Sequence, residues 1–260
     1  MNTDGTLTRR ELLALLGAGA LTAALPGSAA ASNAPSASEA LSPFPLRDVR
    51  LLDGPFRDAQ ARNARYLLSL EPDRLLHNFR VNAGIAPKAP VYRGWESEEP
   101  WIDIRCHGHT LGHYLGAVAM MYAATDDRRF AERADYIVAE LRECQRARGD
   151  GLICAFPEGE KLLHDAIAGR QFAGVPWYTM HKIFAGLRDA HVYASTRGAL
   201  ATLLDLTEWT WDATRDASDD QMQRMLDREH GGMTEILADV SELAGEPRYL
   251  QLARRFAHRP

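Results

Sequence analysis

The sequence has few cysteines and no excess of basic residues. Among its 260 residues are three cysteines, Cys106, Cys144 and Cys154. An odd number of this size argues against a disulfide framework and leaves open one bridge with one spare thiol. Lysine and arginine total 30 against 35 aspartates and glutamates, a formal net charge of −5. Nucleic acid needs a concentrated basic surface, so we do not expect it as a partner.

The chain also lacks several catalytic and binding motifs. It contains no P-loop, no dinucleotide-binding fingerprint and no G-x-S-x-G nucleophile elbow. Strand-like alternation of apolar and polar residues is scarce. What it does have is 46% hydrophobic and 25% charged residues, the composition of a packed soluble protein. This composition excludes long disorder, collagen and disulfide-dense mini-proteins.

Residues 1–31 have the pattern of a twin-arginine export signal. Arg9 and Arg10 precede an apolar run of about 14 residues, and three consecutive alanines then offer a cleavage site. The run is too short for the ~30 Å core of a bilayer, although an uncleaved anchor is the alternative. Residues 32–43, rich in Ser, Ala and Pro, predict a disordered linker. We therefore expect a periplasmic or extracellular protein, free of the membrane after cleavage, whose folded part is residues 44–260.

Residues 109–122, 180–192 and 235–244 each predict a helix with one apolar face. The apolar positions recur at helical spacing and include Leu111, Leu115, Val118, Ile183, Phe184, Leu187, Ile236, Leu237 and Val240. Each helix runs into a short turn and a second helix. The three turns resemble one another and start at Ala124, Ala194 and Ala244. Such recurrence marks repeated helix pairs, which build either an open solenoid or a closed α/α toroid.

The connections between the hairpins favour the toroid. Residues 79–105 and 148–176 are long, irregular and rich in Gly and Pro. A regular solenoid has a steadier period and shorter joins, whereas long loops at one end of helix pairs fit a toroid whose loops line a cavity mouth. We count roughly six or seven helices, and a six-hairpin toroid needs twelve. The sequence therefore predicts an all-α fold of helical hairpins that form part of an (α/α)6 toroid, truncated at about half a barrel.

Histidines crowd the start of the first predicted helix. His109 and His113 are four residues apart, so they lie on one helix face. This spacing suits zinc, but Thr110 stands where the zincin pattern has Glu, and no acid lies between the histidines. Core or capping histidines are a second interpretation. A third is a substrate-binding face, since small neighbours, among them Gly112 and Gly116, leave room and imidazoles donate and accept hydrogen bonds with hydroxyls.

The second predicted helix begins with a similar set of side chains. Trp177 starts it, and Tyr178, His181 and Lys182 share the face opposite its apolar residues. These residue types can contact a sugar through ring stacking and hydrogen bonds. The alternative interpretation is an ordinary solvated face, because charged stripes on helices usually face water.

Two further segments carry acidic residues. The loop 95–103 holds two tryptophans and four acids, beginning with Trp95 and Glu96. Aromatics beside carboxylates can stack on sugar rings and bind their hydroxyls, and surface acids beside a core Trp are the alternative. Glu229 and Glu235 flank the glycines that lead into the third predicted helix, and either residue fits the role of its N-terminal cap.

Three motifs occur in order along the chain: GHTLGHYL at 108–115, VPWYTMHK at 175–182 and GGMTE at 231–235. In this order they resemble the β-L-arabinofuranosidase-like glycoside hydrolases, family 127 and the related family 146. The resemblance covers the chain from about Phe44 onward. It implies an α/α toroid, usually followed by β-sandwich domains, and hydrolysis of arabinofuranosides of plant glycans.

The resemblance also implies a zinc centre that this sequence does not supply. Members of these families use a cysteine nucleophile on a zinc held by Glu and Cys, with a Glu acid/base, near a paired-cysteine motif in the second half of the toroid. This chain has no adjacent cysteines, and Cys106, Cys144 and Cys154 do not fit the pattern. No catalytic residue and no metal ligand is therefore carried over to the chain.

We therefore expect a part of an exported glycoside hydrolase that contributes sugar contacts only. Its partner is an oligo- or polysaccharide. A non-catalytic carbohydrate-binding protein with a helical-repeat surface is the alternative. For the glycoside hydrolase, the predicted substrate-binding residues are Trp95, Glu96, His109, His113, Trp177, Tyr178, His181 and Lys182.

Overall fold

The computed structural model describes residues 44–97, 105–170 and 173–259. These ranges contain ten α-helices and two short 3-10 helices, joined by loops. The predicted signal (1–31) and linker (32–43) lie outside these ranges. The helices are η1 Leu46–Asp48, α2 Pro55–Ser69, α3 Pro72–Asn82, η2 Gly94–Glu96, α4 His109–Thr125, α5 Arg128–Arg148, α6 Glu160–Ile167, α7 Pro176–Ala194, α8 Ala199–Thr214, α9 Asp219–Arg228, α10 Met233–Ala244 and α11 Pro247–Arg255. The all-α prediction is confirmed. Within the described ranges no helix is long and apolar enough to cross a membrane.

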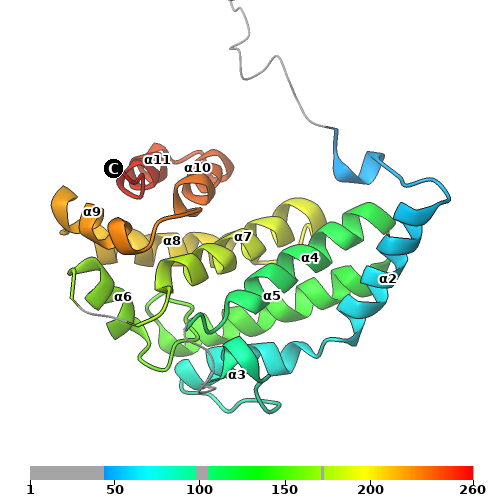
Figure 1. The fold of residues 1–260 in the computed structure, drawn as a ribbon, viewed down its shortest axis with the longest axis horizontal. Coiled ribbons are helices and arrows are strands. Elements are labelled where there is room, and N and C mark those ends of the chain that lie inside the picture. Colours follow the sequence, from blue (N-terminus) through cyan, green and yellow to red (C-terminus); the bar gives the residue numbers. More distant parts are fainter. Residues whose placement is uncertain (1–43, 98–104, 171–172, 260) are drawn as a thin grey trace, which may run out of the picture. The chain divides into compact units, whose positions relative to one another are not determined.

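The three predicted hairpins are present as α4/α5, α7/α8 and α10/α11, and α7 packs against both α4 and α10 (Figure 1). The three turns are alike because the residue that follows the first helix is left-handed in each: Asp126 with φ 58°, Ser195 with φ 52° and Gly245 with φ 64°. The predicted apolar positions are buried, each at 1% exposure or less: Leu111, Leu115, Val118, Ile183, Phe184, Leu187, Ile236, Leu237 and Val240.

The count of six or seven helices is wrong, because α2 and α3 precede the first hairpin and the connections between hairpins contain helices of their own. α6 lies between the first two hairpins and α9 between the second and third. α9 has a capping box, in which the Ser218 side chain accepts from the Gln221 amide and the Gln221 side chain accepts from the Ser218 amide. This Ser-x-x-Gln pattern is readable in the sequence and predicts a helix start.

Glycines bring α4 and α7 into close contact. A methyl group on Gly112 would lie 2.2 Å from the Lys182 carbonyl oxygen, and one on Gly186 would lie 2.6 Å from the Gly112 carbonyl oxygen. On Gly116 it would lie 2.7 Å from Asp189 Oδ2. The expectation that Gly112 and Gly116 leave room for a ligand is therefore wrong, since the neighbouring helix fills that space. Close packing instead fixes the relative positions of the residues that α4 and α7 carry.

Candidate functional site

The N-terminus of α4 is capped by a residue from another element. Its own N-cap residue, Gly108, is left-handed with φ 98° and has no side chain to bind the free amides. The carboxylate of Glu96 in η2 caps the helix instead. Its Oε2 accepts a hydrogen bond from the Gly108 amide at 2.7 Å, and its Oε1 accepts one from the Thr110 amide at 3.3 Å. Glu96 is 4% exposed, and its Oε1 also lies 3.7 Å from His109 Nδ1. This contact also places the neighbouring Trp95 beside the first turn of α4.

Replacing Glu96 with alanine is expected to lower the free energy of unfolding by about 2 kcal/mol, because two hydrogen bonds from backbone amides to a buried carboxylate are lost. Denaturant unfolding at neutral pH measures the difference. The matched control is Glu71→Ala, since exposed Glu71 is the N-cap residue of α3 and its side chain makes no cap bond. A Glu96→Ala cost no larger than the control's would show that the cap contributes nothing.

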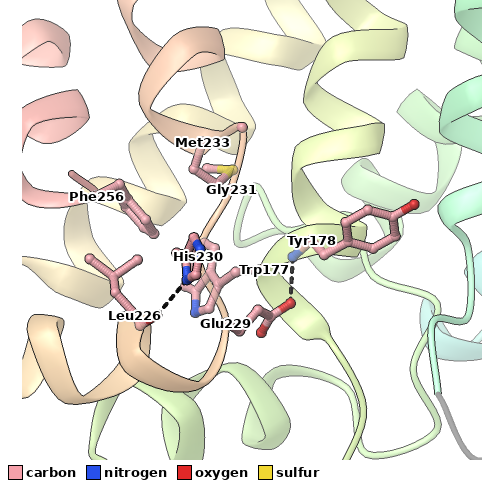
Figure 2. Close-up of a pocket in the computed structure, with 9 residues that line it drawn as sticks. Trp177, Tyr178, Leu226, Glu229, His230, Gly231, Met233 and Phe256 are labelled. Carbon is pink, nitrogen blue, oxygen red and sulfur yellow. Dashed lines mark hydrogen bonds between the residues drawn. The ribbon is translucent and has the colours of Figure 1, made fainter. Parts of the chain in front are cut away.

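The N-terminus of α7 has the same arrangement. Its N-cap residue Val175 makes no side-chain cap bond. Instead, Glu229 Oε1 accepts a hydrogen bond from the Tyr178 amide at 2.5 Å (Figure 2). Glu229 is 6% exposed, and its Oε2 makes no hydrogen bond with a described residue. Burial raises the pKa of Glu229 to about 7, although the Tyr178 amide favours the charged form. Glu229 thus caps the second of the predicted inner helices, not the third.

Six of the eight predicted site residues gather where these two capped helices begin. We name them the imidazole–aromatic cluster: Trp95, His109, His113, Tyr178, His181 and Lys182. The His109 ring lies at its centre, with ring centroids 5.2 Å from Trp95, 5.9 Å from His113 and 6.1 Å from Tyr178. The Lys182 Nζ lies 4.8 Å from the centre of the Tyr178 ring. The Trp95 side chain is 56% exposed and Tyr178 38%, so the cluster faces outward.

The hydrogen bond of His109 defines its tautomer. Its Nδ1 lies 2.8 Å from the Cys106 carbonyl oxygen, which can only accept, so Nδ1 carries the proton. When the ring is neutral, its Nε2 atom is an acceptor. His109 is 6% exposed, so this acceptor is positioned by its surroundings before any ligand arrives.

The pKa values of the other two imidazoles of the cluster are lowered. Burial, with Lys182 and His109 nearby, lowers the pKa of His113. Burial, with Lys182, His113 and Arg188, lowers the pKa of His181 to about 4. A neutral imidazole offers one donor and one acceptor. The cluster therefore combines neutral donors and acceptors, one ammonium group and two half-open aromatic rings.

Trp177 and Glu96 are not part of this open cluster. Trp177 is 2% exposed, and its ring packs edge-on against Phe256 with centroids 4.9 Å apart (Figure 2). The predicted stacking of Trp177 on a sugar is therefore wrong in this structure. One residue along a helix turns the side chain by about 100°, so Tyr178 faces outward while Trp177 faces the core. Glu96 supports the cluster from behind, and no local sequence pattern distinguishes that role from direct contact.

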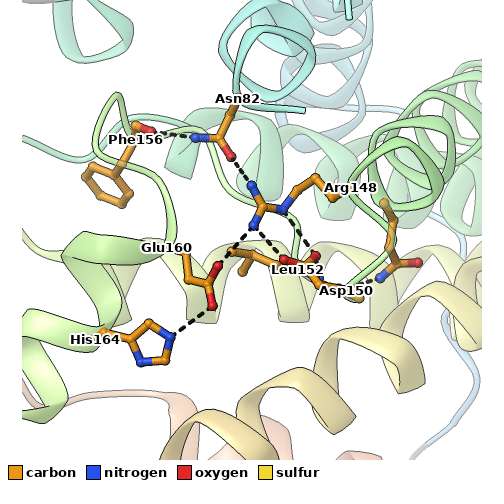
Figure 3. A network of polar contacts seen from close by, with 9 residues as sticks. Asn82, Arg148, Asp150, Leu152, Phe156, Glu160 and His164 are labelled. Atoms are coloured by element: carbon orange, nitrogen blue, oxygen red, sulfur yellow. Dashed lines mark hydrogen bonds and ion pairs between the residues drawn. The ribbon is translucent and has the colours of Figure 1, made fainter. Parts of the chain in front are cut away.

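A second polar cluster lies around the end of α5 (Figure 3). Arg148 bonds Asp150 at 2.6 Å and Asn82 at 3.3 Å, and it lies 3.4 Å from Glu160. Glu160 also bonds His164 at 2.9 Å. These groups bind one another and the loop backbone, so they hold the connection between α5 and α6 and offer no set of converging free groups.

The cysteines do not supply a nucleophile or a metal site. All three are free and buried, which rules out the single bridge that the sequence left open. Burial raises the pKa of Cys106 and Cys154 to about 11 and that of Cys144 to about 12, far from the thiolate form. No group of three or more His, Cys, Asp or Glu suited to a metal ion occurs among the described residues. Zinc does not fit the donor groups present there.

Comparison with known proteins agrees with this architecture. A family model described as the β-L-arabinofuranosidase, GH127 catalytic domain, matches residues 48–260. The chain is similar to the crystal structure of a GH127 β-L-arabinofuranosidase from Geobacillus stearothermophilus T6, with a TM-score of 0.51 and 18% identity over 77% of this chain. The chain spans 28% of the length of that relative. No curated protein matches it.

The structural likeness confirms the predicted fold, helical hairpins of the α/α toroid type. The family match covers nearly all of the described residues and includes all three ordered motifs. The chain therefore belongs to the GH127 β-L-arabinofuranosidase family of glycoside hydrolases.

Proposed function

We propose that the imidazole–aromatic cluster binds an arabinofuranosyl unit of a plant-type glycan for an exported glycoside hydrolase. The observation that carries the proposal is the group of imidazole rings beside an exposed indole at the start of α4 and α7. A neutral sugar needs donors and acceptors for its hydroxyls and an apolar surface for its C–H face. A charged ligand would instead call for several groups of the opposite sign.

The cluster meets these needs with separate side chains. The Nε2 of His109 forms a hydrogen bond with a sugar hydroxyl, and Lys182 and the phenol of Tyr178 donate one. His113 and His181, neutral above their lowered pKa values, donate or accept as the hydroxyls require. The exposed face of Trp95 stacks on the ring. The fixed contact between α4 and α7 keeps these groups in place, which lowers the entropy lost on binding.

The hydrolytic step is not assigned to any described residue. Retaining glycosidases need a nucleophile and an acid/base group about 5 Å apart, and the cluster contains no free carboxylate or thiolate. The zinc that the family resemblance implies finds no suitable donor set among the described residues, so no step is derived through it. Export through the signal in residues 1–31 is part of the same proposal and rests on the sequence pattern alone.

Binding is tested by calorimetric titration of the 260-residue chain with methyl β-L-arabinofuranoside at pH 7.5. Saturable binding is expected. His113→Ala should weaken it about tenfold, since the loss of a hydrogen bond between neutral groups costs about 1.4 kcal/mol. His191→Ala is the control, because His191 lies in the last turn of the same helix α7 as His181 and far along it from the cluster.

Absence of saturable binding to the unaltered chain would refute the proposal. Equal weakening by His191→Ala would show that the loss comes from general destabilisation. Binding without hydrolysis of an aryl arabinofuranoside is expected for this chain with zinc and a reductant present. Turnover abolished by a change in one of its own residues would show that the chain contains the catalytic groups.

A further inference from the structure

A second hollow adjoins the imidazole–aromatic cluster on the other side of Trp95. It lies between the end of α2 and the turn that contains η2, and its volume is about 500 Å³. This is within the range of small-molecule sites, roughly 300–1,000 Å³. Three aromatic residues line it: Tyr66 from α2, Tyr92 and Trp95. The site proposed above uses only Trp95 of these.

We propose that this hollow binds the second sugar unit of the glycan, the one joined to the arabinofuranosyl unit in the cluster. The inference rests on the proposed function and extends it from a single sugar to a chain of sugars. It assigns Tyr66 and Tyr92 to recognition of the substrate, a role that neither residue has from the sequence motifs.

The exposure of the aromatic walls is the first argument. Tyr66 is 61% exposed and Trp95 56%, so two large rings from separate elements leave open faces on one hollow. Open aromatic faces are the usual platform for the C–H surface of a sugar ring. Phe56 on the same helix is more exposed, at 77%, but does not line the hollow, so exposure alone does not define the site.

The fixed position of Tyr92 is the second argument. The Arg74 guanidinium lies 4.0 Å from the centre of the Tyr92 ring, and the Tyr92 hydroxyl accepts a hydrogen bond from the Glu71 amide at 3.0 Å. The wall is thus held in position without a ligand, which reduces the entropy cost of binding.

Continuity with the cluster is the third argument. Trp95 lines the hollow and also contacts the His109 ring edge-on, 5.2 Å between centroids and 65° between planes. Thr110, next to His109 in the chain, lines the hollow as well. The two carboxylate oxygens of Glu96 are occupied by the α4 amides, so this acid presents no free anion to a ligand. Arg93 lines the hollow as well. A hydroxyl-rich ligand that spans both sides of Trp95, such as a disaccharide, fits these features.

The experiment compares methyl β-L-arabinofuranoside with the corresponding β-linked disaccharide in calorimetric titrations of the whole chain. The unaltered chain is expected to bind the disaccharide about tenfold more tightly, since stacking on an open aromatic ring contributes on that scale. Tyr66→Ala should abolish this gain and leave the affinity for the monosaccharide unchanged. Tyr66→Phe should retain the gain, because the ring remains, and Phe56→Ala should leave both affinities unchanged.

The outcomes separate this inference from the proposed function. Equal affinity for both sugars in the unaltered chain would overturn the hollow as a sugar site and leave the cluster assignment standing. Tyr66-dependent binding of the disaccharide without any binding of the monosaccharide would support the hollow and refute the cluster. Failure of both ligands to bind would refute both.

Discussion

Replacing Gly112 with alanine is expected to lower the free energy of unfolding by about 2–3 kcal/mol and to weaken sugar binding. Alanine is the better helix former by about 1 kcal/mol, so propensity alone predicts a gain. The new methyl group, however, would lie 2.2 Å from the Lys182 carbonyl oxygen and 2.7 Å from the Ile183 nitrogen. These are backbone atoms of α7 and cannot rotate away. Overpacking of this kind costs about 1–3 kcal/mol and more where the backbone must move, so the clash outweighs the propensity.

Gly116→Ala on the same helix is the graded comparison. Its methyl group would meet Asp189 Oδ2 at 2.7 Å, and the other Asp189 atoms near it lie at 3.6 Å or more. The end of one side chain can shift where a backbone cannot, so we expect a cost below about 1 kcal/mol. Denaturant unfolding gives both values, and titration with the monosaccharide gives the effect on the cluster. If Gly112→Ala were as stable as the unaltered chain, the two helices would have room between them and would not fix the site.

Periodicity within one helix predicted most of the cluster. His109 and His113 are one turn apart, and Tyr178, His181 and Lys182 follow the same rule on α7, so their shared faces depend on local geometry alone. The same rule separates Trp177 from Tyr178. Applying it to Trp177 would have placed that ring in the core, where the structure shows it beside Phe256.

The two caps could not be predicted from local patterns. Glu96 binds the Gly108 amide across 12 positions of the chain, and Glu229 binds the Tyr178 amide across 51. A capping box is visible only when both partners lie within one turn, as in α9. Which carboxylate reaches which helix depends on how the hairpins pack. The hollow beside Trp95 is beyond sequence reasoning for the same reason, since α2 and η2 meet only in the fold.

Changing Glu229 to glutamine is expected to remove a pH dependence from the stability of the chain. Burial raises the pKa of Glu229 to about 7 in the folded protein, from an ordinary value of 4.5. Between these values the unfolded chain has lost the proton while the folded chain still holds it. Rising pH therefore favours unfolding across this window, and the stability present below pH 4.5 is lost by pH 7. The whole shift in the pKa of this buried carboxyl corresponds to a change of about 3 kcal/mol in the free energy of unfolding.

Glutamine keeps the oxygen that accepts from the Tyr178 amide and does not titrate. Its NH₂ group changes the free energy of unfolding by an amount that does not depend on pH. The measurement is therefore the free energy of unfolding of the variant minus that of the unaltered chain, followed from pH 5 to pH 8. We expect the variant to gain about 2.5 kcal/mol relative to the unaltered chain across this range, since the rest of the change lies below pH 5. Glu235→Gln, on exposed Glu235 of α10, is the control and should show no such gain.

The difference between the two proteins is needed because His181 acts in the opposite direction. Its pKa falls from 6.5 to about 4 on folding, so the unfolded chain takes up this proton first as pH falls, and stability decreases from pH 6.5 to 4. The stability of the unaltered chain therefore decreases both at low pH, through His181, and at high pH, through Glu229. Subtraction of the Glu229→Gln profile leaves the carboxyl contribution, because both proteins contain His181. A flat difference between pH 5 and pH 8 would mean that Glu229 is ionised throughout, as a helix cap held by the positive end of α7 rather than a buried acid.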